Sequence, residues 1–419
     1  MKYDFLPVSK KDMNRLGWDY YDFLFISGDA YVDHPSFGMA ILSRILESEG
    51  YRVCICAQPA PNDVKALERF GVPRLGVLIS GGVIDSMVNH YTAAKKKRSS
   101  DVYSPGGRCG LRPDRCTIAY SKLVRRAFGD IPVIIGGTEA SLRRFAHYDY
   151  WSDSVMKSIL FDSEADLISF GMGERSIVEI ADKLADGFPP RHITNIRGTC
   201  YISDKCPKNA IELPSFEEVS SDKEAYARAA AIQYYEQDAV RGNILAQKCG
   251  DKYLVQNRQS LPLSQKEMDR VYSLGYMRSA HPSYDALGGI PALEEVKFSI
   301  TSSRGCFGSC SFCALTFHQG RVIQSRSHAS ILAEAERFVY DPDFKGYIHD
   351  VGGPTANFRK PACQKQLTKG ACRDRQCLYP SICQNAEVDH RDYLELLRKL
   401  RQIRGVKKVF VRSGIRYDY

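Results

Sequence analysis

No stretch of about 18 consecutive apolar residues occurs anywhere in this sequence, so no membrane-spanning helix is expected. The first residues lack the basic start and the apolar run of a secretory signal. Neither an internal repeat nor a low-complexity tract is present, and none of the glycine-rich loops matches GxGxxG or a Walker A loop. We therefore expect a cytoplasmic globular protein that has no membrane partner and no standard dinucleotide or P-loop site.

The composition is that of an ordinary globular protein, with 44% hydrophobic and 26% charged residues. A chain of 419 residues is long enough for two or three domains. The net charge of +9, part of it in the run 95–98, would help to attract an acidic partner such as RNA. A short basic run at a helix end is more often a solvated face, so this indication is weak.

Fourteen cysteines are the most informative part of the composition. Disulfides are rare in a reducing cytoplasm, so these residues indicate metal ligands, catalytic thiols or buried core residues. Their clustering along the chain decides between these roles.

Short apolar runs alternate with amphipathic stretches in the first half of the chain, which is typical of consecutive βαβ units. We predict an α/β fold with a doubly wound domain over residues 1–205, a helical and loop connector over 206–290, and a second α/β domain over 291–419. The predicted strands are 23–26, 52–56, 75–79, 133–135 and 167–170, and the predicted helices are 39–48, 84–94, 118–128 and 177–184.

Three glycine-rich loops follow the predicted strands, at residues 27–34, 80–82 and 136–139. Ligands of doubly wound sheets lie outside the carboxyl ends of the strands. Glycines at such places also serve tight turns, which is the more common role. Their shared position on one edge of the sheet makes a ligand cleft a hypothesis for this domain.

Cys306, Cys310 and Cys313 lie within eight residues, directly after a strand predicted at 296–300. A compact loop of this kind can give one thiolate to each of three irons of a [4Fe-4S] cluster, and Gly305 and Gly308 permit its turns. The fourth iron has no local cysteine. The alternatives are a zinc knuckle with a remote fourth ligand, or three cysteines placed by chance, but zinc ligands more often come in matched CxxC pairs.

An iron without a protein ligand can bind a cofactor, as the open position of a catalytic zinc does. The open coordination position of this iron suits the amino and carboxylate groups of S-adenosylmethionine (SAM). Reduction of the sulfonium would break a carbon–sulfur bond and release a 5'-deoxyadenosyl radical, which is chemistry that the cofactor supplies. The spacing, the aromatic Phe312 before the last cysteine and the position after a strand together predict this site.

The sequence resembles the radical SAM superfamily at these cysteines, and it is similar over nearly its whole length to the YgiQ family. The strings that carry this resemblance are 28–38, 103–107, 143–153 and 412–418. The resemblance implies a radical SAM enzyme with a [4Fe-4S] cluster, SAM and a flavodoxin-type or ferredoxin-type electron donor. It leaves the substrate open, with methyl- or methylthio-transfer to RNA or to a small molecule as candidate reactions.

Gly352, Gly353, Pro354 and Thr355 follow a strand predicted at 346–351 and look like the superfamily's Gly-Gly-Glu motif. Together with Phe312, these residues are the predicted cofactor-binding set. Pro-Thr replaces the acidic residue, so backbone carbonyl contacts could remain while a carboxylate contact could not. A turn without a ligand is the alternative.

The region 291–419 contains about three strand–helix units, with helices predicted at 330–338 and 393–403 and a last strand at 406–411. The resemblance implies a barrel of six such units. We therefore expect the first half of a (β/α)6 barrel, apparently truncated before the strands that would contact ribose, adenine and substrate.

Cys363, Cys372, Cys377 and Cys383 form a second cluster inside a loop with little apolar content. Four thiolates can hold zinc or a second iron–sulfur cluster, and metal binding would stabilise such a loop. The spacing matches no standard zinc pattern, and the alternative is a set of unpaired or redox-active thiols.

Some radical SAM enzymes carry a cobalamin-binding doubly wound domain before the barrel, and the predicted architecture is similar. The cobalt-ligating motif DxHxxG is broken here, because His34 directly follows Asp33. Cobalamin is therefore a weak prediction, without His34 as its ligand. The competing function is a non-catalytic iron–sulfur or zinc protein that binds nucleic acid through its basic surface.

Overall fold

The computed structural model describes residues 4–417, which fold into two compact units. Among the described residues, the first unit contains 4–236, 242–260 and 276–291, and the second contains 237–241, 261–275 and 292–417. Each unit has its own hydrophobic core. Among residues 4–417, no helix combines the length and the apolar character that a bilayer crossing requires.

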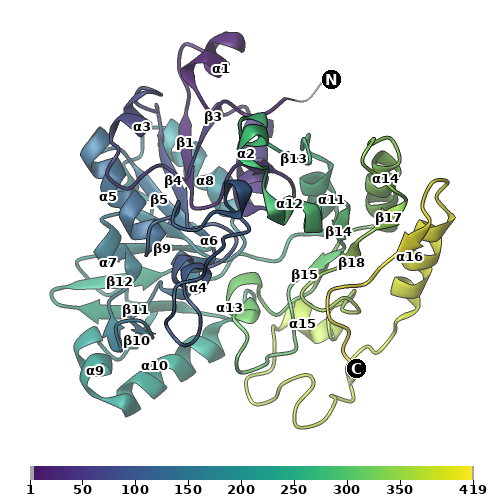
Figure 1. Ribbon diagram of the computed structural model, residues 1–419. Helices are drawn as coiled ribbons and strands as arrows, with labels where there is room; N and C mark the ends of the chain where they lie inside the picture. The colour runs from purple at the N-terminus through teal and green to yellow at the C-terminus, as the bar shows by residue number, and fades with distance from the viewer. Residues whose placement is uncertain (1–3, 418–419) are drawn as a thin grey trace. The chain divides into compact units, whose positions relative to one another are not determined.

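A nine-stranded sheet forms the centre of the first unit (Figure 1). Five of its strands are parallel neighbours, in the order β3-β1-β4-β5-β8. This is the flavodoxin-like order 2-1-3-4-5 of doubly wound folds, so the α/β prediction is confirmed. These strands are β1 (Phe23–Ser27), β3 (Val53–Ala57), β4 (Gly76–Ser80), β5 (Val133–Gly136) and β8 (Leu167–Ser169).

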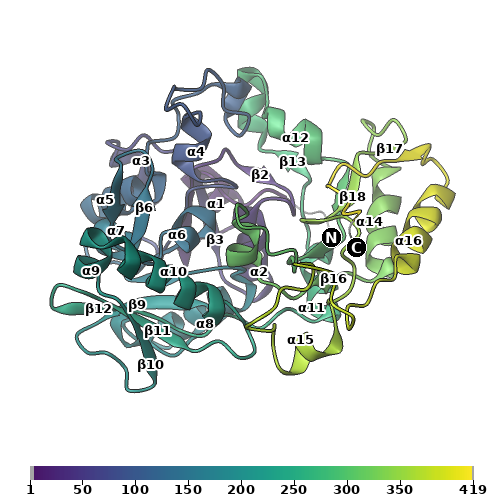
Figure 2. The ribbon, with the colours of Figure 1, turned by 90° about the horizontal axis from the view of Figure 1, so that it is seen from below.

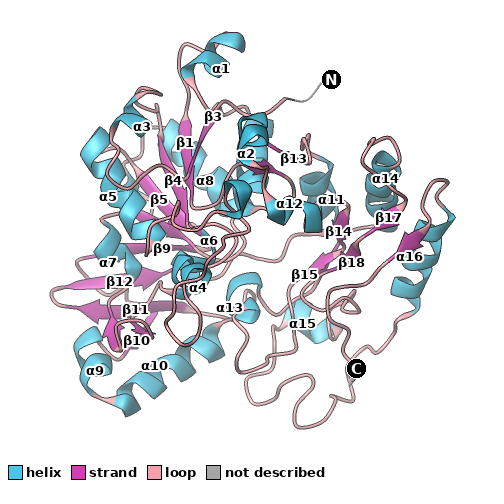
Figure 3. Cartoon of the chain, in the orientation of Figure 1, coloured by secondary structure: helices cyan, strands magenta, loops and turns pink. Residues whose placement is uncertain are grey.

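Helices cover both faces of this parallel part of the sheet (Figure 3). Because side chains alternate along a strand, Leu24 and Ile26 pack on one face, with α5, while Phe23 and Phe25 pack on the other, with α2 and α8. The longer helices of these layers are α2 (Gly38–Ser48), α5 (Cys116–Phe128) and α8 (Glu174–Ala185). The shorter ones are α1 (Lys10–Arg15), α3 (Lys65–Glu68), α6 (Gly137–Leu142) and α7 (Ile159–Ser163).

The predicted connector at 206–290 contributes strands to the same sheet, which differs from the expectation. Strands β11 and β12 form an antiparallel hairpin whose turn contains Gly250 at φ +63°, a conformation that glycine adopts without strain. They extend the sheet with β9 and β10, and α9 and α10 lie beside this end (Figure 2). The added elements are β9 (Thr199–Ser203), β10 (Ala210–Leu213), β11 (Ile244–Cys249), β12 (Lys252–Gln256), α9 (Phe216–Ser221) and α10 (Lys223–Glu236).

The helix predicted at 84–94 is much shorter, because α4 covers only Ser86–His90. Asp85 caps its first turn by accepting hydrogen bonds from two backbone N–H groups. The basic run 95–98 therefore lies in a turn, closed by a bridge between Tyr91 and Lys97, and not at a helix end. Two small antiparallel ladders complete this unit: β2 (Val32–Asp33) with β13 (Ser279–Ala280), and β6 (His147–Asp149) with β7 (Ser154–Met156).

The second unit begins a parallel sheet with two covering helices. Strand β14 pairs with β18, and β17 pairs with β19, both in parallel, as expected for consecutive strand–helix units of a barrel. Buried Ile331, Leu396 and Leu400 face the strands in one apolar cluster. The elements are α12 (Pro291–Val296), β14 (Ser299–Thr301), α14 (His328–Phe338), β17 (Tyr347–Ile348), β18 (Asp350–Gly352), α16 (Arg391–Gln402) and β19 (Lys408–Val409).

The remaining elements of this unit are short. They are α11 (Gln265–Ser273), β15 (Ser303–Arg304), α13 (Leu315–Gln319), β16 (Gln324–Ser325) and α15 (Gln364–Thr368). Strands β15 and β16 form an antiparallel pair, so they close the chain that runs between them into a loop.

Candidate functional site

The predicted cluster loop, residues 305–314, starts where β15 ends and is anchored at its base by the backbone. Gly305 has φ +84°, and a Cβ there would lie 2.2 Å from the carbonyl oxygen of Val322, so only glycine fits this turn. The N–H of Cys306 donates to the carbonyl of Gly320 at 3.0 Å. The first cysteine of the predicted set therefore has a fixed backbone position.

Two of the three thiols face the same glycine. A Cβ added to Gly308 would lie 3.3 Å from the sulfur of Cys306 and 3.9 Å from that of Cys310. The N–H of Gly308 also points at the Cys306 sulfur, at 3.4 Å. The N–H of Cys313 donates to the carbonyl of Cys310 at 3.0 Å, which holds the third cysteine one turn away. Three thiols in so short a loop suit an iron–sulfur cluster as a donor set, and Gly308 leaves room beside two of them.

The Cys306 thiol is the most enclosed of the three. Burial raises its pKa, and the charges of Cys313 and Cys310 raise it further, while hydrogen bonds from Gly308 and Thr355 act in the opposite direction. Without a metal ion, the buried thiol would stay protonated at neutral pH, and a bound cation would favour the thiolate.

Residues 352–355 lie beside this loop. The sulfur of Cys306 is 3.9 Å from the hydroxyl oxygen of Thr355. Both glycines are also required by packing, since a Cβ on Gly352 would meet the Ser413 side chain and a Cβ on Gly353 would lie 2.6 Å from the carbonyl oxygen of Ser303. The carbonyl of Gly352 already accepts the N–H of Ser302 at 2.6 Å. The structure thus places the two predicted segments side by side, with a packing role for both glycines.

Phe312 projects from the loop with 89% of its surface exposed. Its loop neighbour Phe307 is buried instead and stacks on Phe358, with ring centroids 3.9 Å apart. Phe307 therefore stabilises the loop, and Phe312 contributes little to the core.

Arg416 is a site residue that the spacing of the cysteines could not reveal. Its guanidinium donates to the sulfur of Cys310 at 3.4 Å, and its backbone pairs in both directions with the side chain of Asn357, at 3.1 Å each. This contact links the last described residues of the chain to the predicted cluster loop. The only sequence signal was the position of Arg416 inside the similar string 412–418.

The second cysteine set lies around α15. Cys363 precedes the first residue of this helix, and Lys365 and Gln366 in its first turn donate to the sulfurs of Cys372 and Cys377 at 3.2 and 3.6 Å. In residues 4–417, no group of three or more His, Cys, Asp or Glu side chains is arranged to hold a single metal ion. Metal binding at either set stays a prediction.

The strand ends of the first unit are filled by their own side chains. At the switch between β1 and β4, the guanidinium of Arg112 donates to the carbonyl of Gly81 at 2.8 Å and to Asp29 at 2.7 Å. It also pairs with Asp101 at 3.2 Å, and all three charged side chains are at least 96% buried. The predicted ligand cleft at this edge is therefore occupied by a buried ion cluster.

His34 is also part of the interior, with 1% of its surface exposed, and its Nδ1 accepts the N–H of Ser36 at 3.1 Å. This position suits a structural histidine and gives no support to a cobalt ligand. Cobalamin binding stays a prediction that these residues do not favour.

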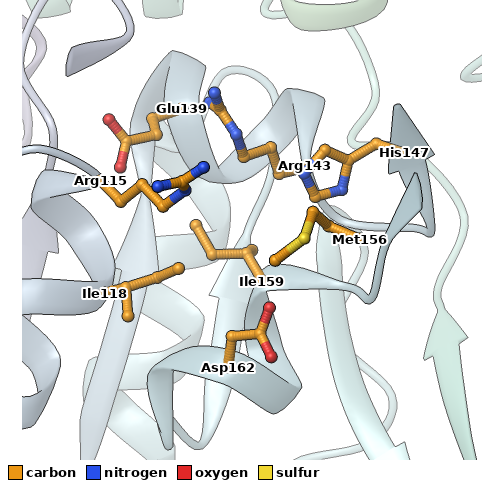
Figure 4. Close-up of a pocket in the computed structure, with 8 residues that line it drawn as sticks. All are labelled: Arg115, Ile118, Glu139, Arg143, His147, Met156, Ile159 and Asp162. Carbon is orange, nitrogen blue, oxygen red and sulfur yellow. The ribbon is translucent and has the colours of Figure 1, made fainter. Parts of the chain in front are cut away.

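A cavity in the first unit is lined by charged and apolar side chains (Figure 4). Its volume of about 10 Å³ has room for roughly one water molecule. The lining carboxylate of Glu139 accepts the N–H groups of Ser86 and Thr117, both at 2.9 Å, and Arg115 pairs with Asp149 at 2.7 Å. This cavity is too small for a substrate.

The family model described as Radical SAM N-terminal matches residues 5–299. UPF0313 proteins from two Clostridium species are similar over 99% of this chain: one from C. botulinum (strain ATCC 19397 / Type A) is 59% identical, and one from C. perfringens (strain 13 / Type A) is 58% identical. The chain spans 65% and 63% of the length of these two relatives.

Among solved structures, the radical S-adenosylmethionine methyltransferase TsrM from Kitasatospora setae, with tryptophan substrate and a SAM analog bound, shows a distant likeness. It is 16% identical with a TM-score of 0.43, and the match covers 79% of this chain and 47% of that one. A likeness at this level is too weak to define a shared fold.

Proposed function

The chain belongs to the radical SAM proteins of the UPF0313, or YgiQ, type, and from this premise we propose that the loop 305–314 holds the [4Fe-4S] cluster of an enzyme that cleaves SAM reductively. The observation that supports the proposal is that the sulfurs of Cys306 and Cys310 both lie beside Gly308, with Cys313 one turn further along the loop. The hydroxyl group of Thr355 lies 3.9 Å from the Cys306 sulfur. Three thiolates coordinate three irons of the cluster and leave the fourth iron for an exchangeable ligand.

The protein residues prepare this site before any cofactor arrives. The Gly305 turn and the hydrogen bond of Cys306 to Gly320 fix the base of the loop, while Arg416 supplies a positive charge beside Cys310. Cys306, Cys310 and Cys313 would hold the cluster, which would supply the electron for reductive cleavage of a carbon–sulfur bond of SAM.

The cofactor-binding roles of the neighbouring segments belong to the same proposal. We assign the edge formed by Gly352, Gly353, Pro354 and Thr355 to the amino end of SAM, because Thr355 contacts the Cys306 thiol. The exposed ring of Phe312 offers an apolar face for a cofactor base to stack on. A flavodoxin-type or ferredoxin-type protein would supply the electron.

The test is reductive cleavage of SAM by the full-length protein after anaerobic reconstitution with iron and sulfide, with dithionite as the electron source. We expect 5'-deoxyadenosine to form, and to be lost in Cys310→Ala. The matched control is Cys249→Ala, a half-buried cysteine of β11, which should retain the activity.

Absence of a cubane spectrum in the unmodified protein, or equal cleavage by Cys310→Ala, would refute the proposal. Salt-sensitive RNA binding with no cleavage of SAM would support a non-catalytic nucleic-acid-binding protein instead. If cleavage occurs, transfer of the SAM methyl group to RNA or to a small molecule, with or without sulfur, is the next reaction to assay.

A further inference from the structure

The loop 363–383 gathers four cysteines that the proposed SAM site does not use. Cys363 lies at the N-terminus of α15. Lys365 and Gln366 of this helix donate to the sulfurs of Cys372 and Cys377. The N–H of Cys383 donates to the carbonyl of Cys377 at 2.9 Å, which brings the fourth cysteine back to the third. Helix α15 therefore contacts the sulfurs of Cys372 and Cys377 and follows directly on Cys363, while the turn links Cys383 to Cys377.

The Cys377 side chain is partly buried. Burial and then the charges of Cys363, Cys372 and Cys383 raise the pKa of its thiol to about 11. All four thiols of the loop are partly buried and free of disulfide bonds, and thiols of this kind suit a metal centre as donors.

We infer that Cys363, Cys372, Cys377 and Cys383 ligate a second iron–sulfur cluster. Zinc fits this loop less well, because a zinc ion of Zn–S bond length about 2.3 Å draws its sulfurs to within roughly 4 Å, usually from cysteines two to four residues apart. Here eight, four and five residues separate successive cysteines. A cluster distributes its thiolates over several irons and tolerates wider gaps.

The surroundings of the loop fit a redox centre. The ammonium of Lys365, at 3.2 Å from the Cys372 sulfur, and the amide of Gln366 both donate to sulfur, and such donors stabilise the reduced form of a cluster. Cys377 packs against the small apolar group that also contains Cys306 and Leu378. The two cysteine sets of this unit thus share one apolar contact region.

The number of ligands separates the two centres chemically. Three thiolates leave an iron open for a small molecule, whereas four complete the coordination of the cluster. A closed cluster has no place for substrate, so its chemistry is storage of one electron taken from a one-electron donor protein. This assignment does not depend on the binding of SAM at Cys306.

Metal content after removal of the first set tests the inference. The full-length variant Cys306→Ala/Cys310→Ala/Cys313→Ala, reconstituted anaerobically, should keep iron and acid-labile sulfide in equal amounts, with an EPR signal after reduction. Adding Cys377→Ala and Cys383→Ala should abolish both. The assignment would be overturned if the five-fold variant retained iron. It would also be overturned if the three-fold variant contained no iron, or contained one zinc ion without sulfide.

A second measurement removes no cysteine, so it does not depend on whether the cysteine variants fold. Lys365→Met leaves every cysteine in place but removes the charged donor to Cys372, so the cluster of the three-fold variant should shift to a more negative reduction potential. Lys369→Met, at the end of α15, is the matched control and should leave the potential unchanged. Equal potentials in both variants would show that Lys365 does not touch a cluster and would contradict the proposed geometry.

Discussion

Replacement of Arg112 by methionine would leave two carboxylates buried without a cation. The Arg112 side chain is fully buried, and those of Asp29 and Asp101 are 4% and 1% exposed. Removing one partner of a buried ion cluster costs about 3–5 kcal/mol, because the remaining charge loses its compensation. The first unit should therefore unfold at about 1–2 M less urea, for a slope near 3 kcal/mol per M.

The unfolding of this unit can be followed alone. Both tryptophans of the chain, Trp18 and Trp151, belong to the first unit, and Trp18 packs against its core. Tryptophan fluorescence during a urea titration thus reports this unit and not the second one. The matched control is Arg15→Met, because the pair of Arg15 with Asp4 is more than half exposed and contributes at most about 1 kcal/mol.

The stability lost in Arg112→Met should depend on pH. Burial raises the pKa of Asp29 to about 6, although Arg112 acts in the opposite direction. A folded-state pKa above the unfolded value stabilises the fold at low pH, and this contribution is lost as the pH rises through the folded pKa. Without Arg112 the folded pKa rises further, so the deficit of Arg112→Met should be smaller at pH 5 than at pH 8.

Two outcomes would refute this account of the strand ends. A loss below about 1 kcal/mol would mean that the ion cluster does not hold these loops together. A deficit that is equal at pH 5 and pH 8 would mean that Asp29 is not left ionised in a buried place. The double variant Arg112→Met/Asp29→Asn should recover part of the loss, since it removes one of the stranded charges.

Three further changes test other parts of the chain. Gly305→Ala should destabilise the second unit by about 2–4 kcal/mol, because the backbone there is left-handed and the added Cβ would meet Val322, and it should also lower iron uptake. In the control Gly414→Ala, no atom lies within 4 Å of the added Cβ, so neither effect is expected. Circular dichroism during unfolding and iron analysis would measure the two effects. Burial lowers the pKa of His147 to about 4, so the neutral side chain stabilises the fold above the unfolded pKa of about 6.5. About 2 kcal/mol of the free energy of unfolding, after allowance for partial exposure, should be lost as the pH falls toward 4. The same dependence of stability on pH in His147→Asn would contradict this. Phe312→Ala should leave thermal stability within about 0.5 kcal/mol but weaken SAM binding roughly tenfold by calorimetry, and unchanged affinity would remove Phe312 from the site.

The predicted elements of the first unit agree with the structure where the sequence pattern is strong. Buried parallel strands are continuous apolar runs, so 23–26 and 133–135 were recognisable from the residues alone. The hairpin of β11 and β12 was missed because its strands mix polar and apolar residues, and only Gly250 marked the turn. Its place in the sheet depends on pairing with β9, which is a contact between distant parts of the chain.

The sequence alone identified the two groups of cysteines as candidate metal ligands, because residues of one loop are close in sequence and their spacing is visible. It also determined the doubly wound pattern, since burial on two faces imposes apolar periodicity on each strand and helix. Only the tertiary structure decided that Arg112 fills the strand ends where a ligand was expected, that Thr355 meets Cys306, and that Arg416 approaches Cys310. These contacts join residues 31 to 106 positions apart, and no local pattern encodes a pairing over such a separation.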